Sequence, residues 1–229
     1  MKKNLTELVF ILDRSGSMRG LEGDTIGGFN AMLDRQREQG GEANITTILF
    51  DDHYEKIHDR FSLEWVKELT DKDYYVRGCT ALLDAMGRAI HEMALLQKHL
   101  PDSERAEKVI FVITTDGLEN ASREYSRSQV KSMVERERDT YGWEFLFLGA
   151  NMDAVSEAGS FGIGADRSVT FQNDSQGIRT NYRVVGETIS RMRCAPPMAA
   201  PIGAEWKKEI EKDFQKRRKG LFGKKGRKA

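Results

Sequence analysis

The feature that most constrains the fold is an apolar run, LVFIL, over residues 8–12. Five consecutive apolar residues predict a strand over residues 6–13 that is buried on both faces, as in the centre of a parallel sheet. The run stops at Asp13, and Ser15 and Ser17 follow at alternate positions. Side chains at alternate positions of an extended or tightly turning segment point the same way. We therefore expect one carboxylate and two hydroxyls to converge on a cation at the end of this strand.

The oxygen ligands predict the kind of cation. One carboxylate and two neutral hydroxyls suit a hard ion that accepts octahedral oxygen coordination and keeps exchangeable waters, so we expect Mg²⁺, with Mn²⁺ as the alternative. Zinc would favour nitrogen or sulfur ligands. The alternative interpretation of these five residues is a capping turn, because Asp and Ser are also common in turns.

Two further segments supply similar groups. The apolar run KVIFVITT over residues 108–115 predicts a second strand, which ends at Asp116-Gly117. A short loop, Gly78-Cys79-Thr80, opens a long predicted helix over residues 82–100 and offers a third hydroxyl, from Thr80.

In this order, the three segments resemble the von Willebrand factor A domain and its metal-ion-dependent adhesion site. That site has the pattern Asp-x-Ser-x-Ser, then a loop Thr, then an Asp at a strand end, and the resemblance covers residues 5–175. It implies that Asp13, Ser15, Ser17, Thr80 and Asp116 hold a divalent cation, the carboxylates directly or through water.

Strands and helices alternate along the chain, which predicts a doubly wound α/β fold with a mostly parallel sheet and helices on both faces. The turn at Asp51-Asp52 is too short for a crossover helix, so residues 53–61 are expected to form an antiparallel edge strand. The resemblance implies six strands in the order 3-2-1-4-5-6. Ligands of such sheets bind where the strand order reverses, which is between the strands that end at Asp13 and Asp116. The expected strands are 6–13, 45–50, 53–61, 108–115, 143–148 and 168–171, and the expected helices are 24–38, 82–100, 126–140, 154–158 and 176–193, with a short amphipathic piece at 64–69.

The length of 229 residues and the 39% of hydrophobic residues fit one domain, which we place at residues 1–195. Residues 196–229 are expected to form a proline-containing linker, a short charged helix over 204–218 and a basic tail. The net charge of zero conceals this division, because residues 207–229 carry eleven Lys or Arg and three acids. The tail is either a solvated segment or a contact for an acidic surface such as nucleic acid or anionic lipid.

Further sequence features concern the cellular location, the two cysteines and the packing of one predicted helix. No segment has the length of a signal peptide or a membrane span, so a cytoplasmic location is expected. Cys79 and Cys194 are far apart and lack a Cys-x-x-Cys spacing, which argues against a disulfide framework and a zinc site. Gly27-Gly28, within a predicted helix, is expected to permit close packing of that helix on the sheet.

The predicted function is a metal-dependent protein interaction module. A cation held mainly by neutral hydroxyls keeps its attraction for an anionic oxygen, so a Glu or Asp of a partner would complete its coordination. The resemblance further implies a small bacterial-type member that works beside an ATPase or a stress-response assembly, and a last helix, 176–193, that moves when the site takes a ligand.

A Mg²⁺-dependent phosphoester or ester hydrolase is the alternative. The sequence places no general base near the cation. His53 and His58 fall on the expected edge strand, and His91 and His99 fall on the long helix away from its start. Glu119 is the best candidate base, although a turn cap or a place on the rim is the simpler role. We therefore do not expect an enzyme.

Overall fold

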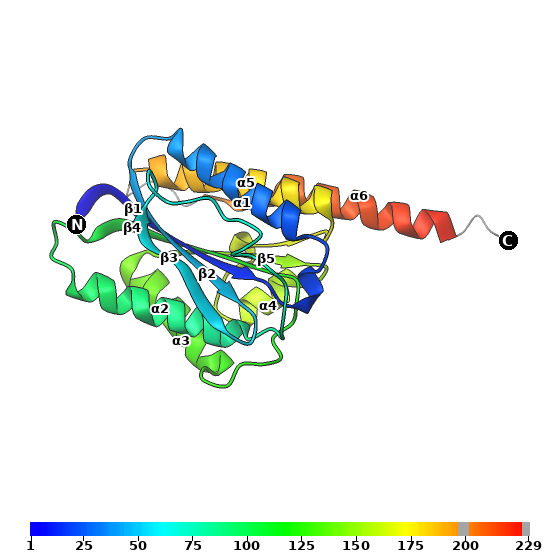
Figure 1. Cartoon of the computed structure of the whole chain (residues 1–229), viewed down its shortest axis with the longest axis horizontal. Coiled ribbons are helices and arrows are strands. Elements are labelled where there is room, and N and C mark those ends of the chain that lie inside the picture. The colour runs from blue at the N-terminus through cyan, green and yellow to red at the C-terminus, as the bar shows by residue number, and fades with distance from the viewer. Residues whose placement is uncertain (197–201, 226–229) are drawn as a thin grey trace.

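The computed structural model describes residues 1–196 and 202–225. Six strands form one sheet in the order β3-β2-β1-β4-β5-β6, and only the β2–β3 pair is antiparallel (Figure 1). The predicted fold class, strand order and antiparallel edge strand are confirmed. The strands are β1 (Lys2–Asp13), β2 (Glu42–Phe50), β3 (Tyr54–Ser62), β4 (Ala106–Thr115), β5 (Glu144–Ala150) and β6 (Ser168–Phe171), and the helices are α1 (Glu22–Arg37), α2 (Leu82–His99), α3 (Arg127–Tyr141), α4 (Ala154–Ser160), α5 (Ser175–Cys194) and α6 (Lys208–Lys225).

Strand β1 supplies both halves of the core, because successive side chains of a strand point to opposite faces. Leu8, Phe10 and Leu12 pack with residues of α1 and α5 on one face. Val9 and Ile11 pack with residues of α2, α3 and α4 on the other. Figure 1 shows these two helical layers above and below the sheet. The apolar run over residues 8–12 therefore fixes β1 in the middle of the molecule.

A long segment without a helix, residues 63–81, joins β3 to α2. The amphipathic piece predicted at 64–69 is a turn followed by irregular chain. Side chains of α1 satisfy its backbone, since Asn30 bonds to both the N–H and the carbonyl of Leu69, and Arg37 donates to the carbonyls of Leu63 and Val66. These bonds replace the internal bonds of a helix, while Leu63, Val66 and Leu69 are buried.

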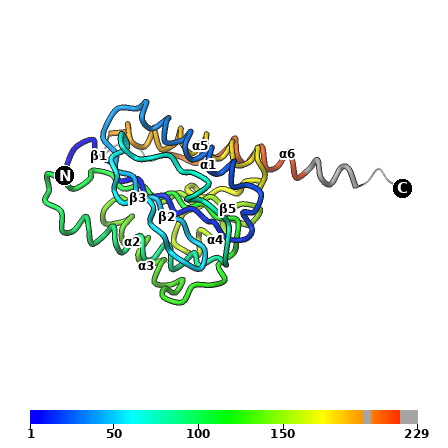
Figure 2. Tube along the Cα trace, in the orientation of Figure 1, coloured from blue at the N-terminus to red at the C-terminus, as the bar shows by residue number. Residues whose placement is uncertain are grey.

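The C-terminal segment is bound to the domain. Trp206 and Ile210 are buried in the core, and the Trp206 indole donates to the carbonyl of Asp166 at 2.8 Å. A 3₁₀ turn occupies Ala204–Lys207, and α6 continues to Lys225, beyond the predicted end at residue 218. Figure 2 shows the coloured part of α6 leading away from the sheet. Most of the predicted linker (197–201) and the end of the basic tail (226–229) lie outside the described residues.

No helix in the described ranges is both long enough and apolar enough to span a membrane.

Helices α1 and α5 touch through a glycine. A Cβ added at Gly28 would lie 2.5 Å from the ring of Tyr182 in α5, whereas one added at Gly27 would meet nothing within 4 Å. Of the two glycines, only Gly28 makes the close contact that was predicted for Gly27-Gly28. The contact is with helix α5, whereas the prediction was a contact with the sheet.

Two alanine substitutions test this contact. We expect Gly28→Ala to lower the free energy of unfolding by about 1–3 kcal/mol, because the added methyl overpacks the Tyr182 ring. Gly27→Ala is expected to raise it by up to about 1 kcal/mol, because alanine favours the helix and the site has space. Urea unfolding measures both, and equal effects of the two variants would contradict the assigned contact.

Candidate metal centre

Three loops meet at the carboxyl ends of β1 and β4. The first follows Asp13 and contains Ser15 and Ser17, the second leads through Thr80 into α2, and the third begins at Asp116. Backbone bonds join the first two, since the N–H of Gly16 donates to the carbonyl of Gly78 at 3.3 Å. The second and third are joined by the N–H of Asn120, which donates to the carbonyl of Thr80 at 3.1 Å.

The side chains of these loops form a connected set of oxygens. Thr80 Oγ1 lies 3.1 Å from Ser15 Oγ, which lies 3.1 Å from Ser17 Oγ. Ser17 Oγ in turn donates to Asp116 Oδ1. Asp13 lies beside them, because its Oδ1 accepts the N–H of Ser15 at 2.7 Å. The structure thus brings all five predicted residues together, and their role as metal ligands stays a prediction.

Glycine allows the close approach of two of these loops. A Cβ added at Gly117 would lie 2.6 Å from the hydroxyl of Thr80. Gly78 has φ +66°, a left-handed conformation, and a Cβ there would lie 2.1 Å from Asp52 Oδ1. Any larger residue at position 117 would displace the Thr80 hydroxyl from the oxygen set.

The charges of the centre favour a cation. Burial raises the pKa of Asp13 to about 6, against the hydrogen bonds from Thr115 and Ser15, and the nearby Asp116 raises it further. Burial also raises the pKa of Asp116. Among the side chains that the structure describes, in residues 1–196 and 202–218, no Lys or Arg forms an ion pair with either carboxylate. Oxygen donors, crowded hydroxyls and two uncompensated carboxylates therefore fit a hard divalent cation.

Asn173 is a residue of the centre that sequence reasoning missed. Its Nδ2 donates to Asp116 Oδ2 at 2.8 Å, which leaves the other oxygen of Asp116 toward Ser17. The Asn173 N–H donates to Asn151 Oδ1 at 3.2 Å, and Asn151 adopts a left-handed φ of 53°. The available signal was position, because Asn173 closely follows the end of β6 at the same edge of the sheet.

The carboxylate of Glu119, the candidate base, accepts hydrogen bonds from its own loop and from the start of α2. Its Oε2 accepts the N–H of Leu83 at the start of α2 and the hydroxyl of Ser122, each at 2.8 Å. Its Oε1 accepts the N–H groups of Ala121 and Ser122 at 2.9 and 2.8 Å. These bonds match the turn-capping role that was the simpler expectation.

The histidines are placed partly as expected. His58 lies in β3, is buried, and bonds to Thr47 Oγ1 at 3.0 Å. His53 precedes β3 and lies in the turn after β2, so the prediction that it belongs to the edge strand is wrong. The turn is set by Asp51, whose Oδ1 accepts the His53 N–H at 2.6 Å.

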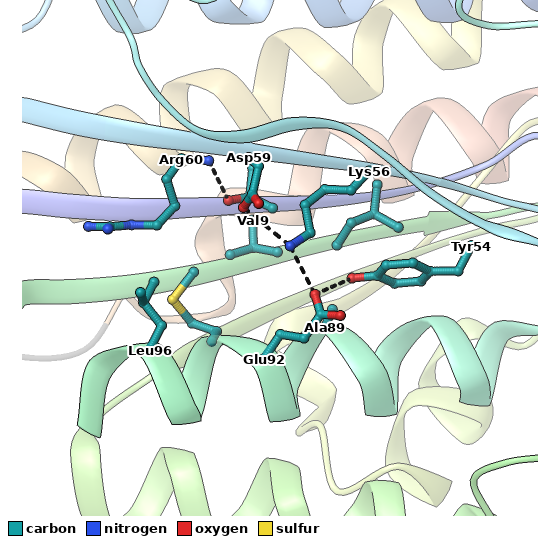
Figure 3. A pocket seen from close by; sticks show the side chains of 11 residues that line it. Val9, Tyr54, Lys56, Asp59, Arg60, Ala89, Glu92 and Leu96 are labelled. Atoms are coloured by element: carbon teal, nitrogen blue, oxygen red, sulfur yellow. Dashed lines mark hydrogen bonds and ion pairs between the residues drawn. The ribbon is translucent and has the colours of Figure 1, made fainter. Parts of the chain in front are cut away.

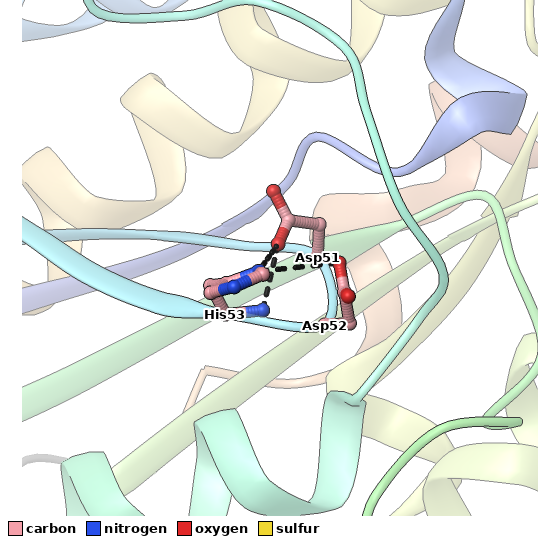
Figure 4. Close-up of side chains that lie close together, drawn as sticks. All are labelled: Asp51, Asp52 and His53. Atoms are coloured by element: carbon pink, nitrogen blue, oxygen red, sulfur yellow. Dashed lines mark hydrogen bonds and ion pairs between the residues drawn. The ribbon is translucent and has the colours of Figure 1, made fainter.

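Asp51, Asp52 and His53 form a second group of possible ligands, with one atom from each within 4.8 Å of the others (Figure 4). Asp51 already forms ion pairs with two arginines, since Arg14 Nε and Arg77 Nε lie 2.9 and 2.7 Å from its Oδ2. Burial acts to raise the pKa of Asp51, but the hydrogen bond from Arg77 and the charge of Arg14 outweigh it and hold the pKa below its usual value. A metal ion here would have to compete with both guanidinium groups, so the Asp13 centre is the better cation site.

A cavity of about 350 Å³ lies between β3 and α2 (Figure 3). Its charged side chains are paired, because Lys56 contacts Asp59 and Glu92 at 3.2 and 3.0 Å and Arg60 contacts Glu7 at 2.8 Å. Tyr54 adds a hydrogen bond to Glu92 at 3.1 Å. The pairing leaves little charge for a ligand, and the cavity lies apart from the metal centre.

Comparison with solved structures identifies the fold. The chain superposes on the von Willebrand factor domain of the type V pilus tip protein Mfa5 from Porphyromonas gingivalis with a TM-score of 0.58 and 10% identity, covering 86% of this chain and 98% of that one. Proximal thread matrix protein 1 from the mussel byssus gives a TM-score of 0.55 at 16% identity, covering 81% of this chain. The pilus adhesin SpaC from Lactobacillus rhamnosus GG gives 0.56 at 12% identity, covering 84% of this chain and 30% of that one.

These likenesses confirm the von Willebrand factor A fold that the sequence resembled. One structure of the mussel protein, with a TM-score of 0.55, has a zinc-occupied metal-ion-dependent adhesion site. The chain spans 46% of the length of the mussel protein. No protein-family model and no curated protein sequence matches the chain.

A measurement of Mn²⁺ binding shows which of the two acidic groups, the Asp13 centre or the Asp51 group, holds a cation. We expect Mn²⁺ at about 100 times its Kd to stabilise the metal-free protein by about 2.7 kcal/mol, or roughly 5–10 °C in Tm. Asp116→Ala should abolish this shift, because it removes a carboxylate of the predicted centre, and His53→Ala should leave it intact. Thermal unfolding with and without Mn²⁺ measures the shift. Its loss in His53→Ala and survival in Asp116→Ala would move the site to the Asp51 group.

Proposed function

Starting from a von Willebrand factor A fold with a connected set of oxygens at the reversal point of its sheet, we propose that the chain is a metal-dependent protein interaction module. A divalent cation, Mg²⁺ in the first place, is held by Asp13, Ser15, Ser17, Thr80 and Asp116. An acidic side chain of a partner protein completes its coordination. The observation that carries the proposal is the hydroxyl chain from Thr80 through Ser15 and Ser17 to Asp116.

The chemistry of the donor set supports an acidic partner. Three of the five donors are neutral hydroxyls, which leave more of the positive charge of the ion uncompensated than carboxylates would. Ser15 and Thr80 are buried, whereas Ser17 is exposed, so the ion would be open to solvent on the side of Ser17. A partner carboxylate arriving there forms a charge-assisted bond at the edge of a buried site.

The known structures support the same class of function. Two of the similar structures are a pilus tip protein domain and a pilus adhesin, and the mussel protein has zinc in its adhesion site. For this chain, the partner class and the choice of Mg²⁺ are our inferences from the oxygen donors. The cytoplasmic location expected from the sequence belongs to the same proposal, as does the bacterial setting beside an ATPase or stress-response assembly that the resemblance implies.

We prefer a binding role to a hydrolytic one. A hydrolase that uses the same cation needs a general base within reach of the attacking water. Glu119 is committed to four hydrogen bonds in the loop that leads from Asp116 and at the start of α2. In our proposal, this carboxylate shapes the rim of the metal centre and takes no part in chemistry.

Partner capture tests the proposed function. We expect the immobilised protein to retain a partner from a lysate of its source with Mg²⁺ and to release it with EDTA or with an excess of a soluble acidic peptide. Ser17→Ala should reduce retention at least tenfold, because it removes an exposed hydroxyl ligand without opening a buried cavity. The matched control is Ser103→Ala, an exposed serine in the loop before β4, at the opposite end of that strand from the centre. Retention that is insensitive to EDTA would contradict the proposal.

An assay with p-nitrophenyl phosphate tests the hydrolase. We expect no Mg²⁺-dependent release of p-nitrophenol by the wild-type protein above that of Ser17→Ala, since Glu119, the candidate base, already accepts four hydrogen bonds. Hydrolysis that Glu119→Gln abolishes without weakening Mn²⁺ binding would establish the enzyme instead.

A further inference from the structure

Arg14, which lies inside the Asp13–Ser17 motif, is fully buried, with 0% of its surface exposed. Its backbone belongs to the loop of the metal centre, but its side chain contacts other residues. Nε lies 2.9 Å from Asp51 Oδ2, and Nη1 lies 2.7 Å from Glu55 Oε2. The guanidinium also lies near the ring of Tyr75, with Cζ 5.3 Å from the ring centroid.

The partners of Arg14 connect the first two loops of the centre. Asp51 Oδ2 also accepts a hydrogen bond from Arg77 Nε at 2.7 Å, and the Arg77 N–H donates to the carbonyl of Arg14 at 2.9 Å. The carbonyl of Asp51 accepts the N–H of Ala81, next to Thr80, at 2.9 Å. One buried carboxylate residue thus contacts the side chain of the serine loop and the backbone of the threonine loop.

The same part of the chain is tied from a second direction. The N–H of Arg14 donates to the carbonyl of Phe50 at 2.9 Å, which extends the β1–β2 pairing by one bond. The Tyr74 hydroxyl donates to the carbonyl of Asp13 at 2.5 Å. The backbone from Asp13 to Arg14 is therefore clamped between the end of β2 and the 63–81 segment.

A buried ion pair is a poor means of adding stability, because the loss of hydration offsets much of the attraction between the charges. Its geometry is nevertheless restrictive, since a buried guanidinium must keep its partners at hydrogen-bond distance. A pair of this kind at the junction of two ligand loops fixes their separation, and hence the distance between the Ser15 and Thr80 hydroxyls.

We propose that Arg14 and Asp51 are positioning residues of the metal centre, which hold the serine loop against the threonine loop so that their hydroxyls are arranged before the cation binds. This inference rests on the proposed function, since it concerns the same cation. It adds a layer of residues that touch neither the ion nor the partner and that set the affinity for the ion through the loop geometry.

A matched ion pair elsewhere in the chain separates positioning from stability. Glu7 in β1 is also fully buried, and its Oε1 lies 2.8 Å from Arg60 Nη2. Glu7 precedes Asp13 by six residues, or about 20 Å along a strand. Arg60→Met leaves the Glu7 carboxylate with Asn44 as its donor, and Arg14→Met leaves Asp51 with Arg77 and the N–H of His53. Both variants therefore remove one guanidinium from a buried carboxylate, at different distances from the centre.

The experiment measures Mn²⁺ affinity by electron paramagnetic resonance in the full-length protein, at a temperature where circular dichroism reports every variant as folded. We expect Arg14→Met to weaken Mn²⁺ binding at least tenfold, and Arg60→Met to change it less than twofold while lowering Tm comparably. Asp51→Asn, which keeps the size of the side chain, should also weaken binding at least tenfold. Wild-type affinity in both Arg14→Met and Asp51→Asn, or equal weakening in Arg60→Met, would overturn the inference.

Hydrogen exchange in the metal-free protein provides a second readout. Arg14→Met should reduce protection of the Gly16 and Arg77 amides at least tenfold, because these amides join the two loops, and Arg60→Met should not. If the wild-type protein binds no Mn²⁺, the proposed function fails. Loss of protection confined to these loops would then still support the positioning role, and unchanged protection would overturn it.

Discussion

The parallel pairing of β1 with β4 is the constraint on which the rest of the structure depends. The two strands pair from Thr6 with Lys108 to Leu12 with Thr114, so both end at the same edge of the sheet. Thr115 Oγ1, at the end of β4, donates to Asp13 Oδ2, at the end of β1, at 2.6 Å. Because the register is fixed by side chains buried on both faces, the two acidic loops cannot slide apart without exposing the core.

The edge of the sheet contains two acidic groups with opposite electrostatic character. Asp13 and Asp116 have hydroxyl and amide donors, and their pKa values are raised by burial. Asp51, on the neighbouring strand end, has two guanidinium partners and a lowered pKa. The first group has no positively charged partner and fits a cation, whereas the second is already paired with two guanidinium groups. Proximity of carboxylates alone would not separate these two groups, but the positions of the arginines do.

Side-chain hydrogen bonds hold the loops around the centre in place. The 63–81 segment takes its hydrogen bonds from Asn30 and Arg37 of α1, and Tyr74 reaches from it to the backbone of Asp13. Glu119 holds the start of α2 near the third loop. A site built on loops that are fixed in this way binds a ligand with less loss of conformational entropy.

The sequence by itself determined the elements and most of the centre. Apolar runs at residues 8–12 and 108–115 predict buried strands from pattern alone. The polar residues that follow these runs, Asp13, Ser15, Ser17 and Asp116, are four of the five predicted ligands. These residues can be recognised in the sequence because they are polar and stand where an apolar run ends. Thr80 was found through its place before a long helix, and the order of the strands through resemblance.

Only the tertiary structure decided what surrounds these residues. Asn173 reaches Asp116 across 57 positions of sequence, and Arg14 meets Asp51 across 37, and which side chains meet there depends on how the loops pack. Trp206 and Ile210 are buried in the core although a proline-rich stretch precedes them in the sequence. The elements that carry them contact β6 and α5, and the sequence alone did not show that these two elements offer them a surface. Local chemistry can be read along a chain, whereas contacts between distant residues depend on how strands and helices pack in three dimensions.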